Sequence, residues 1–465
     1  MGHRAGARAD VIARIVSPLL ALLLLGGCSG SGATPRHRIG ALPFPGTFTL
    51  YRAADPNDLG PHRYARTPRF FQPDERESGI IYTTRAGFLD VAHLRLTIDW
   101  THYYARRVRA AIDARFERFA LPALDGETFH VTLNYPDDWH DLDDAQRSAL
   151  ADELALRCGQ RLAYQMMTWH ELITWFGHRR VLLIDESPSA FTYDDGMSHA
   201  IGLRVAERAL RGSPDRGNGA VADGSRAPID WRNGDAAVTA ALRAELADLG
   251  AVSQAQTDRA NDMIARRATA AAECGIDCAT AVGARIDWRN GDAAVTAALR
   301  AELADLGAVT PAQTDRAARA VEGIWWARGN PLKRQLDVGL SDDAMRPWLV
   351  PGLSFAPIDA EPDPIRLPTL ADVAGRDCSS FCSIRIQPNI PEAARMRAAV
   401  PGAPAQFTGE RDLALLLAAT RRAMRGQLAA DVDRPWPAPR MAPPPSTRPT
   451  VELAHHASSP ARSSR

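Results

Sequence analysis

The stretch Asp144–Gly177 reads DAQRSALADELALRCGQRLAYQMMTWHELITWFG, and it decides the predicted fold. Its apolar residues recur at helical spacing and Gly177 is a typical stop, so we predict a helix over Asp144–Phe176. Similar patterns predict helices over Phe88–Phe119 before it and Tyr193–Leu210 after it. Three long helices therefore form the centre of the predicted domain.

Short stretches with strand character lie beside these helices in the sequence. The clearest is Glu127–Tyr135, where apolar and polar residues alternate in ETFHVTLNY. Thr47–Arg52, Gly79–Thr84 and the apolar Val181–Asp185 are the other candidates. We expect an α+β fold, mostly helical, with three long helices around a buried polar cluster and short strands alongside.

A tandem duplication follows the third helix. Ile229–Ala260 and Ile286–Ala317 differ only at Ser253/Thr310 and Gln254/Pro311. Each copy carries one amphipathic helix, and two copies are too few for a solenoid. We expect one copy to pack on the core and the other to be an insertion. A further helix is predicted over Gly409–Ala430.

The N-terminus has the features of an export signal. Three arginines precede the apolar run Ile15–Leu25, which is too short to span a bilayer. Leu25-Gly26-Gly27-Cys28 resembles the lipobox of bacterial lipoproteins, which implies cleavage before Cys28 and its acylation with palmitate and other chains. Ser29 then implies sorting to the outer membrane, facing the periplasm. An ordinary secretory signal that contains a cysteine is the alternative.

These features predict the organisation of the whole chain. Residues 1–27 are a lipoprotein signal peptide, 28–46 a tether, 47–210 the helical core domain, 211–227 a loop, 228–320 the duplicated helical segment, 321–431 the remainder of the core and 432–465 a disordered tail. With 45% hydrophobic residues the chain is globular in class, and its formal net charge of +0 argues against nucleic acid as a partner.

The other cysteines would lie in an oxidising compartment. Cys274 and Cys278 form one C-x3-C pair and Cys378 and Cys382 another, and we predict a local disulfide within each. Zinc is not expected at either pair, because the spacing is not C-x2-C. Cys158 is predicted to be a buried thiol.

Ionisable residues interrupt the apolar faces of the predicted helices. Asp90 and His93 share one helix face, which we expect to be buried. His170 and Glu171 begin like a zinc-protease motif, but Thr174 stands where the second histidine belongs, so that motif is absent. Satisfied buried polar groups without chemistry are the alternative at both positions.

The start of the third helix adds further polar residues. Thr192 and Asp195 have the spacing of a capping box, and Asp195 and His199 lie one turn apart. Arg95 and Asp99 are spaced for an i, i+4 ion pair. Ser187 and Ser189 lack the G-x-S-x-G pattern of a serine hydrolase.

The leading functional hypothesis is a metal-dependent hydrolase of cell-envelope material. His93, His170 and a carboxylate, Asp90 or Asp195, would hold a divalent metal such as zinc, and Glu171 would be the general base. The competing hypothesis is a non-catalytic envelope module, binding or structural, with the same cluster in its core. The expected partners are outer-membrane lipid through acylated Cys28 and either peptidoglycan or an envelope protein.

Two family resemblances bear on these hypotheses. GFLDVAHLRLTIDW, WHELITWFG and ESPSAFTYDD, after a lipobox, resemble an uncharacterised family of Gram-negative bacterial lipoproteins, a domain of unknown function, over about Gly40 to Ala430. The matching motif residues are Asp90, His93, Arg95, His170, Glu171, Trp175, Ser189, Phe191 and Asp195. Glu186-Ser187 and Phe191 are also similar to the E-S-x-F pattern of lytic transglycosylases, which implies Glu186 as an acid cleaving peptidoglycan. The extra residues between Glu186 and Phe191 depart from that pattern.

Overall fold

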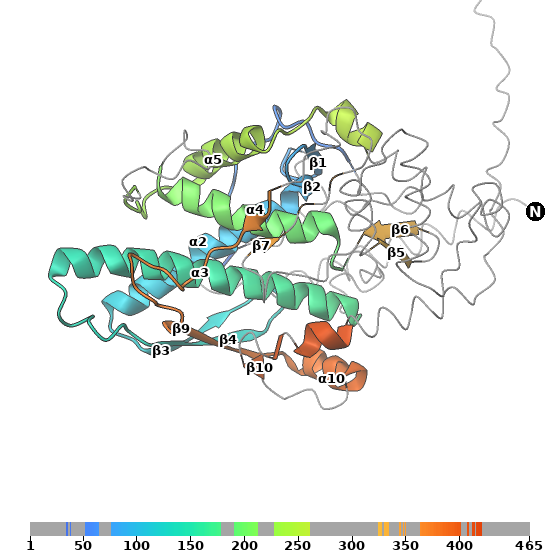
Figure 1. The fold of residues 1–465 in the computed structure, drawn as a ribbon. Coiled ribbons are helices and arrows are strands. Elements are labelled where there is room, and N and C mark those ends of the chain that lie inside the picture. Colours follow the sequence, from blue (N-terminus) through green and yellow to red (C-terminus); the bar gives the residue numbers. More distant parts are fainter. Residues whose placement is uncertain are drawn as a thin grey trace, which may run out of the picture.

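The computed structural model has an α+β fold that is mostly helical, as predicted. It describes residues 52–64, 76–177, 190–212, 227–260 and 363–400, and shorter stretches at 34–35, 38, 324–327, 330–333, 344–345, 347, 349, 407–408, 412–413 and 415–420. Helix α2 (Val91–Asp113) packs along both α3 (Asp144–Trp175) and α4 (Tyr193–Leu210). Figure 1 shows these helices side by side at the centre of the molecule.

The bounds of the central helices follow from local capping and from pairing with strands. Asp143 and Gln146 form a capping box that starts α3 where it was predicted. Helix α2 starts later than predicted, because β2 (Gly87–Asp90) pairs antiparallel with β1 (Ile80–Thr83). It also ends before Phe119, since the chain leaves the helix to enter the next strand.

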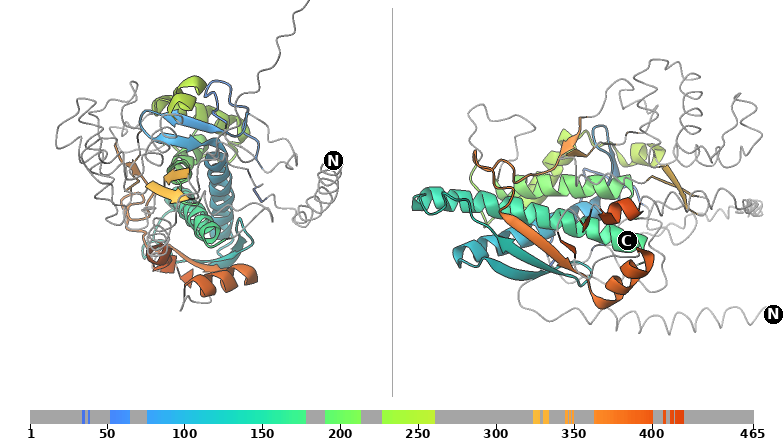
Figure 2. Two further views of the ribbon diagram at one scale, coloured as in Figure 1. Left: turned by 90° about the vertical axis from the view of Figure 1, so that its right-hand side faces the viewer. Right: turned by 60° about the horizontal axis from the view of Figure 1, so that its bottom comes forward.

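A four-stranded antiparallel sheet has the order β10 (Phe407–Thr408), β9 (Cys382–Gln387), β4 (Thr128–Leu133), β3 (Arg118–Pro122). It lies along α3 on the side away from α4 (Figure 1 and Figure 2). Strand β4 alternates as predicted, and its buried residues are Phe129, Val131 and Leu133. The C-terminal β9 therefore pairs with a strand from the first third of the chain.

The first copy of the duplication packs on the central helices. Its helix α5 (Asp235–Asp248) lies against α4 and buries Val238, Leu242 and Leu246. The second copy and the predicted strand Val181–Asp185 lie outside the described residues, as does most of Thr47–Arg52. The smaller described elements are β5 (Ile324–Ala327), β6 (Asn330–Lys333), β7 (Ala344–Met345), β8 (Ile365–Arg366) and α10 (Ile390–Ala399), and residues 412–413 and 415–420 of the predicted C-terminal helix are helical.

Glycine 159 allows α3 to cross α2 at very short distance. A Cβ atom at Gly159 would lie 2.5 Å from the backbone nitrogen of Ala105 and 2.6 Å from its Cα atom. These atoms belong to helical backbone, so they cannot turn away as a flexible side chain could.

We therefore predict that Gly159→Ala destabilises the protein by about 3 kcal/mol, the upper end for overpacking a core. The direction of the stability change is informative, because alanine is a better helix former than glycine by about 1 kcal/mol and would otherwise stabilise α3. Urea unfolding measures the change. Ala149→Gly, on the exposed start of α3, is the matched control and should cost only that helix propensity. An unchanged or raised stability of Gly159→Ala would contradict the close crossing.

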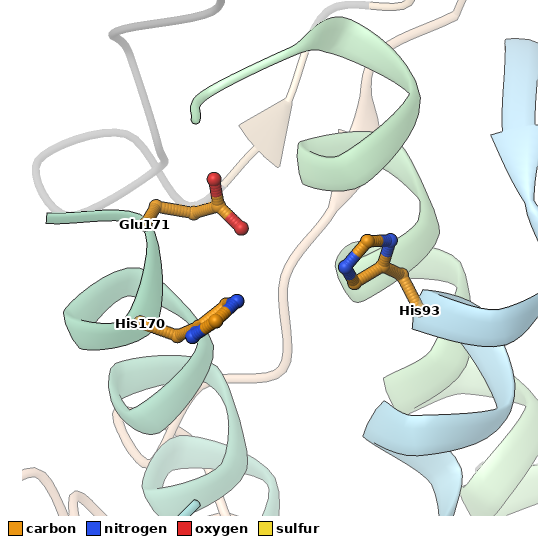
Figure 3. Close-up of side chains that lie close together, drawn as sticks. All are labelled: His93, His170 and Glu171. Carbon is orange, nitrogen blue, oxygen red and sulfur yellow. The ribbon is translucent and has the colours of Figure 1, made fainter. Parts of the chain in front are cut away.

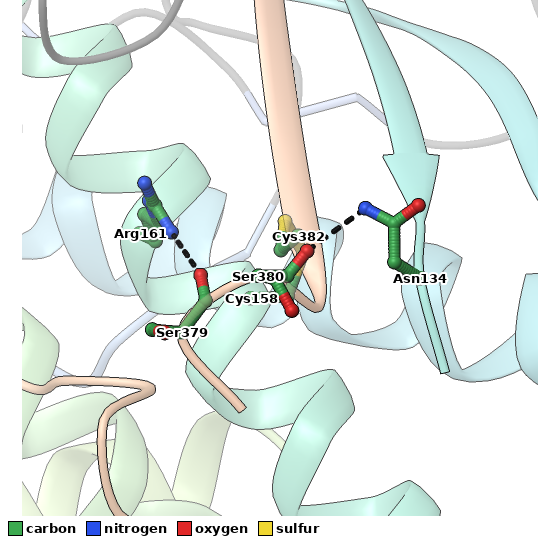
Figure 4. The surroundings of a disulfide bond; sticks show 6 residues. All are labelled: Asn134, Cys158, Arg161, Ser379, Ser380 and Cys382. Carbon is green, nitrogen blue, oxygen red and sulfur yellow. Dashed lines mark hydrogen bonds between the residues drawn. A yellow bond between two sulfur atoms is a disulfide. The ribbon is translucent and has the colours of Figure 1, made fainter. Parts of the chain in front are cut away.

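The disulfide of the described residues joins Cys158 to Cys382, not Cys378 to Cys382 as predicted. Cys382 opens β9 with its side chain buried toward α3, and the two Cα atoms are 5.8 Å apart, a normal distance for a disulfide. Figure 4 shows the bond between helix and strand. Cys158 is buried as predicted, but it is disulfide-bonded and not a thiol, whereas Cys378 is a buried free thiol. Cys274 and Cys278 lie outside the described residues.

Candidate metal centre

His93, His170 and Glu171 meet between the start of α2 and the end of α3. Each offers one ligand atom, and these atoms all lie within 4.8 Å of one another. Figure 3 shows the two imidazoles turning a nitrogen toward each other, with the Glu171 carboxylate beside them. Two imidazoles and a carboxylate are a common ligand set for catalytic zinc.

A carboxylate orients the His170 ring through Nδ1. Nδ1 of His170 lies 2.8 Å from Oδ2 of Asp125, whose side chain is 1% exposed. Since an ionised carboxylate only accepts, Nδ1 of His170 is the donor to Asp125, and Nε2 is the ring nitrogen left for a ligand. Asp125 lies in the turn between β3 and β4, so the sheet supports the end of α3.

Two carboxylates also lie beside the His93 ring, as ion-pair partners of Nδ1. Its Nδ1 lies 2.8 Å from Oδ1 of Asp195 and 3.2 Å from Oδ2 of Asp90. The other oxygen of Asp90 caps α2 by accepting from the backbone nitrogens of Ala92 and His93. The other oxygen of Asp195 accepts from the Thr192 hydroxyl at 2.6 Å. Both carboxylates are fixed, and Nε2 is the nitrogen of His93 that remains.

A backbone N–H holds the Glu171 carboxylate. Its Oε2 accepts from the nitrogen of Phe191 at 2.7 Å. Phe191 has a φ of 60°, in the left-handed region that a bulky residue rarely adopts. Such backbone strain is concentrated at functional sites, where surrounding structure maintains it.

The centre gathers several carboxyl groups in a buried environment, and this shifts the pKa values of its ionisable side chains. Burial, and then the charge of Asp195, raise the pKa of Glu171 to about 8. Burial, and then the charges of Asp195 and Asp90, raise the pKa of Asp194 to about 8. Burial opposes a charge on His93, but Asp195 and Asp90 outweigh it and hold the pKa of His93 well above its usual value. A cation bound here would displace protons from His93 and Glu171.

His199 is a third imidazole next to the centre. It is buried, and its ring packs edge-on against that of His93 with 5.6 Å between centroids. Burial, and then the charge of His93, lower the pKa of His199 to about 3, so it is neutral. It does not belong to either ligand set found among the described residues.

Several predicted contacts are corrected. Asp90, Asp195 and His93 form a second group of ligand atoms within 4.8 Å, on the other ring nitrogen of His93, so the two aspartates do not join His170 around one point. Thr192 bonds the Asp195 side chain and makes no side-chain bond to the helix start, so the capping box is absent.

The predicted ion pair on α2 is replaced by longer-range contacts. Arg95 donates to the carbonyl oxygens of Gly60 and Pro61, and Asp99 pairs with Arg38 and His62. Ser187, Ser189 and Glu186 lie outside the described residues.

Sequence reasoning missed Asp125. It is followed by Gly126 in a short turn between strands, where an aspartate is common for local reasons. Nothing in that pattern indicates a histidine 45 residues away.

Comparison with known proteins gives a family but no activity. A family model described as "Protein of unknown function (DUF4056)" matches residues 23–267. No curated protein and no solved structure matches the chain. The match includes all five predicted site residues and Asp125, but it ends well before Ala430, to which the resemblance was expected to extend.

Proposed function

The chain belongs to the DUF4056 family, which is described as having no known function, and we propose from its site that it is a metal-dependent hydrolase. His93 and His170 would hold a divalent metal such as zinc through Nε2. Glu171, which the sequence predicted as the general base, would instead be the third ligand, because it forms one group of ligand atoms with both imidazoles. When bound, the metal would supply Lewis acidity for the attack of water on the scissile bond.

The observation that carries this proposal is the pairing of each imidazole with its own carboxylate. Metal-binding histidines usually donate their second ring nitrogen to a carboxylate or a carbonyl, which sets the tautomer and the ring orientation. His170 has this hydrogen bond to Asp125, and Nδ1 of His93 lies 2.8 Å from Oδ1 of Asp195 as an ion pair. The described residues offer three ligands, and catalytic zinc sites use three and keep one position open, whereas structural sites use four.

The charge of the cluster favours the same conclusion. Asp90, Asp195 and Glu171 are buried, and although burial opposes it, the charges of Asp195 and Asp90 hold the pKa of His93 well above its usual value. Gathering several carboxylates in a buried place is costly, and a divalent cation offsets that cost.

The proposed substrate is cell-envelope material, and the proposed location is the periplasmic face of the outer membrane. The lipobox-like Leu25–Cys28 supports a lipid anchor at Cys28. The disulfide between Cys158 and Cys382 fits an oxidising compartment. No helix among the described residues has both the length and the apolar character needed to cross a membrane.

Glu171→Gln separates this function from the competing one, a non-catalytic envelope module with a polar core. Glutamine keeps the size of the side chain and can still accept from Phe191, but it loses the charge. A ligating Glu171 predicts metal affinity lowered more than about tenfold, with the free energy of unfolding changed by less than about 1 kcal/mol. A structural Glu171 predicts a loss of about 1–3 kcal/mol and no change in metal binding.

Glu245→Gln is the matched control, because Glu245 is also buried but pairs with Arg204 and Arg208 on α4. It should lower stability without affecting metal binding. Metal titration, urea unfolding and release of soluble fragments from isolated cell envelopes are the measurements. A metal-loaded wild-type protein that releases no fragments would contradict the hydrolase and favour the envelope module.

A further inference from the structure

The C-terminal segment β9–α10 reaches the metal centre although it lies outside the family match. Strand β9 pairs with β4 over its whole length, from Thr128 opposite Gln387 to Leu133 opposite Cys382. This register carries the chain after β9 past the turn that holds Asp125. Asn389, the N-cap of α10, lies at that turn.

Asn389 holds the backbone of Asp125. Its Nδ2 donates to the carbonyl oxygen of Asp125 at 2.8 Å, and Oε2 of Glu127 accepts from the Asp125 backbone nitrogen at 2.9 Å. The turn is therefore held on both sides of the residue whose side chain orients His170. A continuous chain of hydrogen bonds runs from Asn389 through Asp125 to the imidazole.

The turn is also packed closely against Asn389. Gly126 has a φ of +92°, and a Cβ atom there would lie 3.4 Å from Nδ2 of Asn389. The oxygen of the Asn389 amide has a partner as well, because Oδ1 accepts from the backbone nitrogen of Glu392 in a capping box. Both ends of the amide are used, so its orientation is fixed by the start of α10.

We propose that Asn389 is a positioning residue for the metal ligand His170, so that the C-terminal segment completes a centre whose ligands all lie within the family-matched region. This inference rests on the proposed metal-binding function. Asn389 does not touch the metal. It acts by keeping the Asp125 carboxylate hydrogen-bonded to Nδ1 of His170, and this bond keeps Nε2 directed at the centre.

Asn389→Ser tests this role. Serine caps helices as well as asparagine does, but it is too short to reach the carbonyl of Asp125. We expect the dissociation constant for Co²⁺, followed by its visible absorption, to rise about tenfold, the low end for loss of an outer-shell partner. Asn389→Ala, which also loses the cap, should bind Co²⁺ like Asn389→Ser while being less stable.

Asn134→Ser is the matched control. Nδ2 of Asn134 donates to the carbonyl oxygen of Ser380 at 2.9 Å, at the opposite end of β9 (Figure 4). This variant loses the same kind of bond far from His170 and should bind Co²⁺ within twofold of wild type. Equal affinities of Asn389→Ser and Asn134→Ser would overturn the inference. Absence of Co²⁺ binding by the wild-type protein would instead overturn the proposed function.

Discussion

The His93→Ala variant will purify without bound divalent metal and will lack the proposed hydrolytic activity. His93 supplies one of the three ligand atoms of the centre, and it alone joins α2 to the ligands on α3. Loss of an outer-shell partner already costs 10–100-fold in metal affinity, so we expect loss of this ligand to cost more than about 100-fold. Elemental analysis of purified protein and Co²⁺ titration measure the effect.

His130→Ala is the control for this experiment. His130 lies on β4, and its Nε2 contacts the Gln387 side chain, so this variant removes an imidazole outside the centre. His93→Ala also leaves Asp90 and Asp195 without the positive partner between them, which costs stability. His170→Ala is therefore measured beside it, because it removes a ligand from the other helix. Full metal occupancy in both His93→Ala and His170→Ala would refute the proposal that these histidines bind the metal.

Two of the central helices could be predicted from the sequence. Helices α3 and α4 lie where the apolar spacing put them, to within a residue. The start of α2 could not be predicted, because Phe88 and Leu89 are apolar and fit a helix as well as a strand. What assigns them to β2 is antiparallel pairing with Ile81 and Tyr82, a contact made only in the folded chain.

The candidate site was predicted in part. His93, His170 and Glu171 could be recognised because ionisable residues within apolar helix faces need partners. The identity of those partners depends on the fold. Asp125 reaches His170 only because the β3–β4 turn lies beside the end of α3. The aspartates that were predicted as ligands lie instead on Nδ1 of His93.

Loss of the Cys158–Cys382 bond will lower the free energy of unfolding by about 2–5 kcal/mol. The two cysteines are 224 residues apart, so the bond removes much of the freedom of the unfolded chain. It also fastens the start of β9 to α3, and β9 is the strand that brings α10 to the Asp125 turn. The double variant Cys158→Ser/Cys382→Ser, measured by urea unfolding, avoids leaving a new free thiol.

Cys378→Ser distinguishes this bond from the local pair that its spacing had suggested. Cys378 is a buried free thiol, and its replacement removes no cross-link, so it should cost less than about 1.5 kcal/mol. Dithiothreitol should lower the stability of Cys378→Ser by about as much as it lowers that of wild type, because both keep the long-range bond. If Cys378 were paired with Cys382, Cys378→Ser would already match the double variant, and peptide mapping without reduction would link Cys378 to Cys382. A closed loop of only a few residues restricts the unfolded chain much less, so a large loss in the double variant itself argues for the long-range bond.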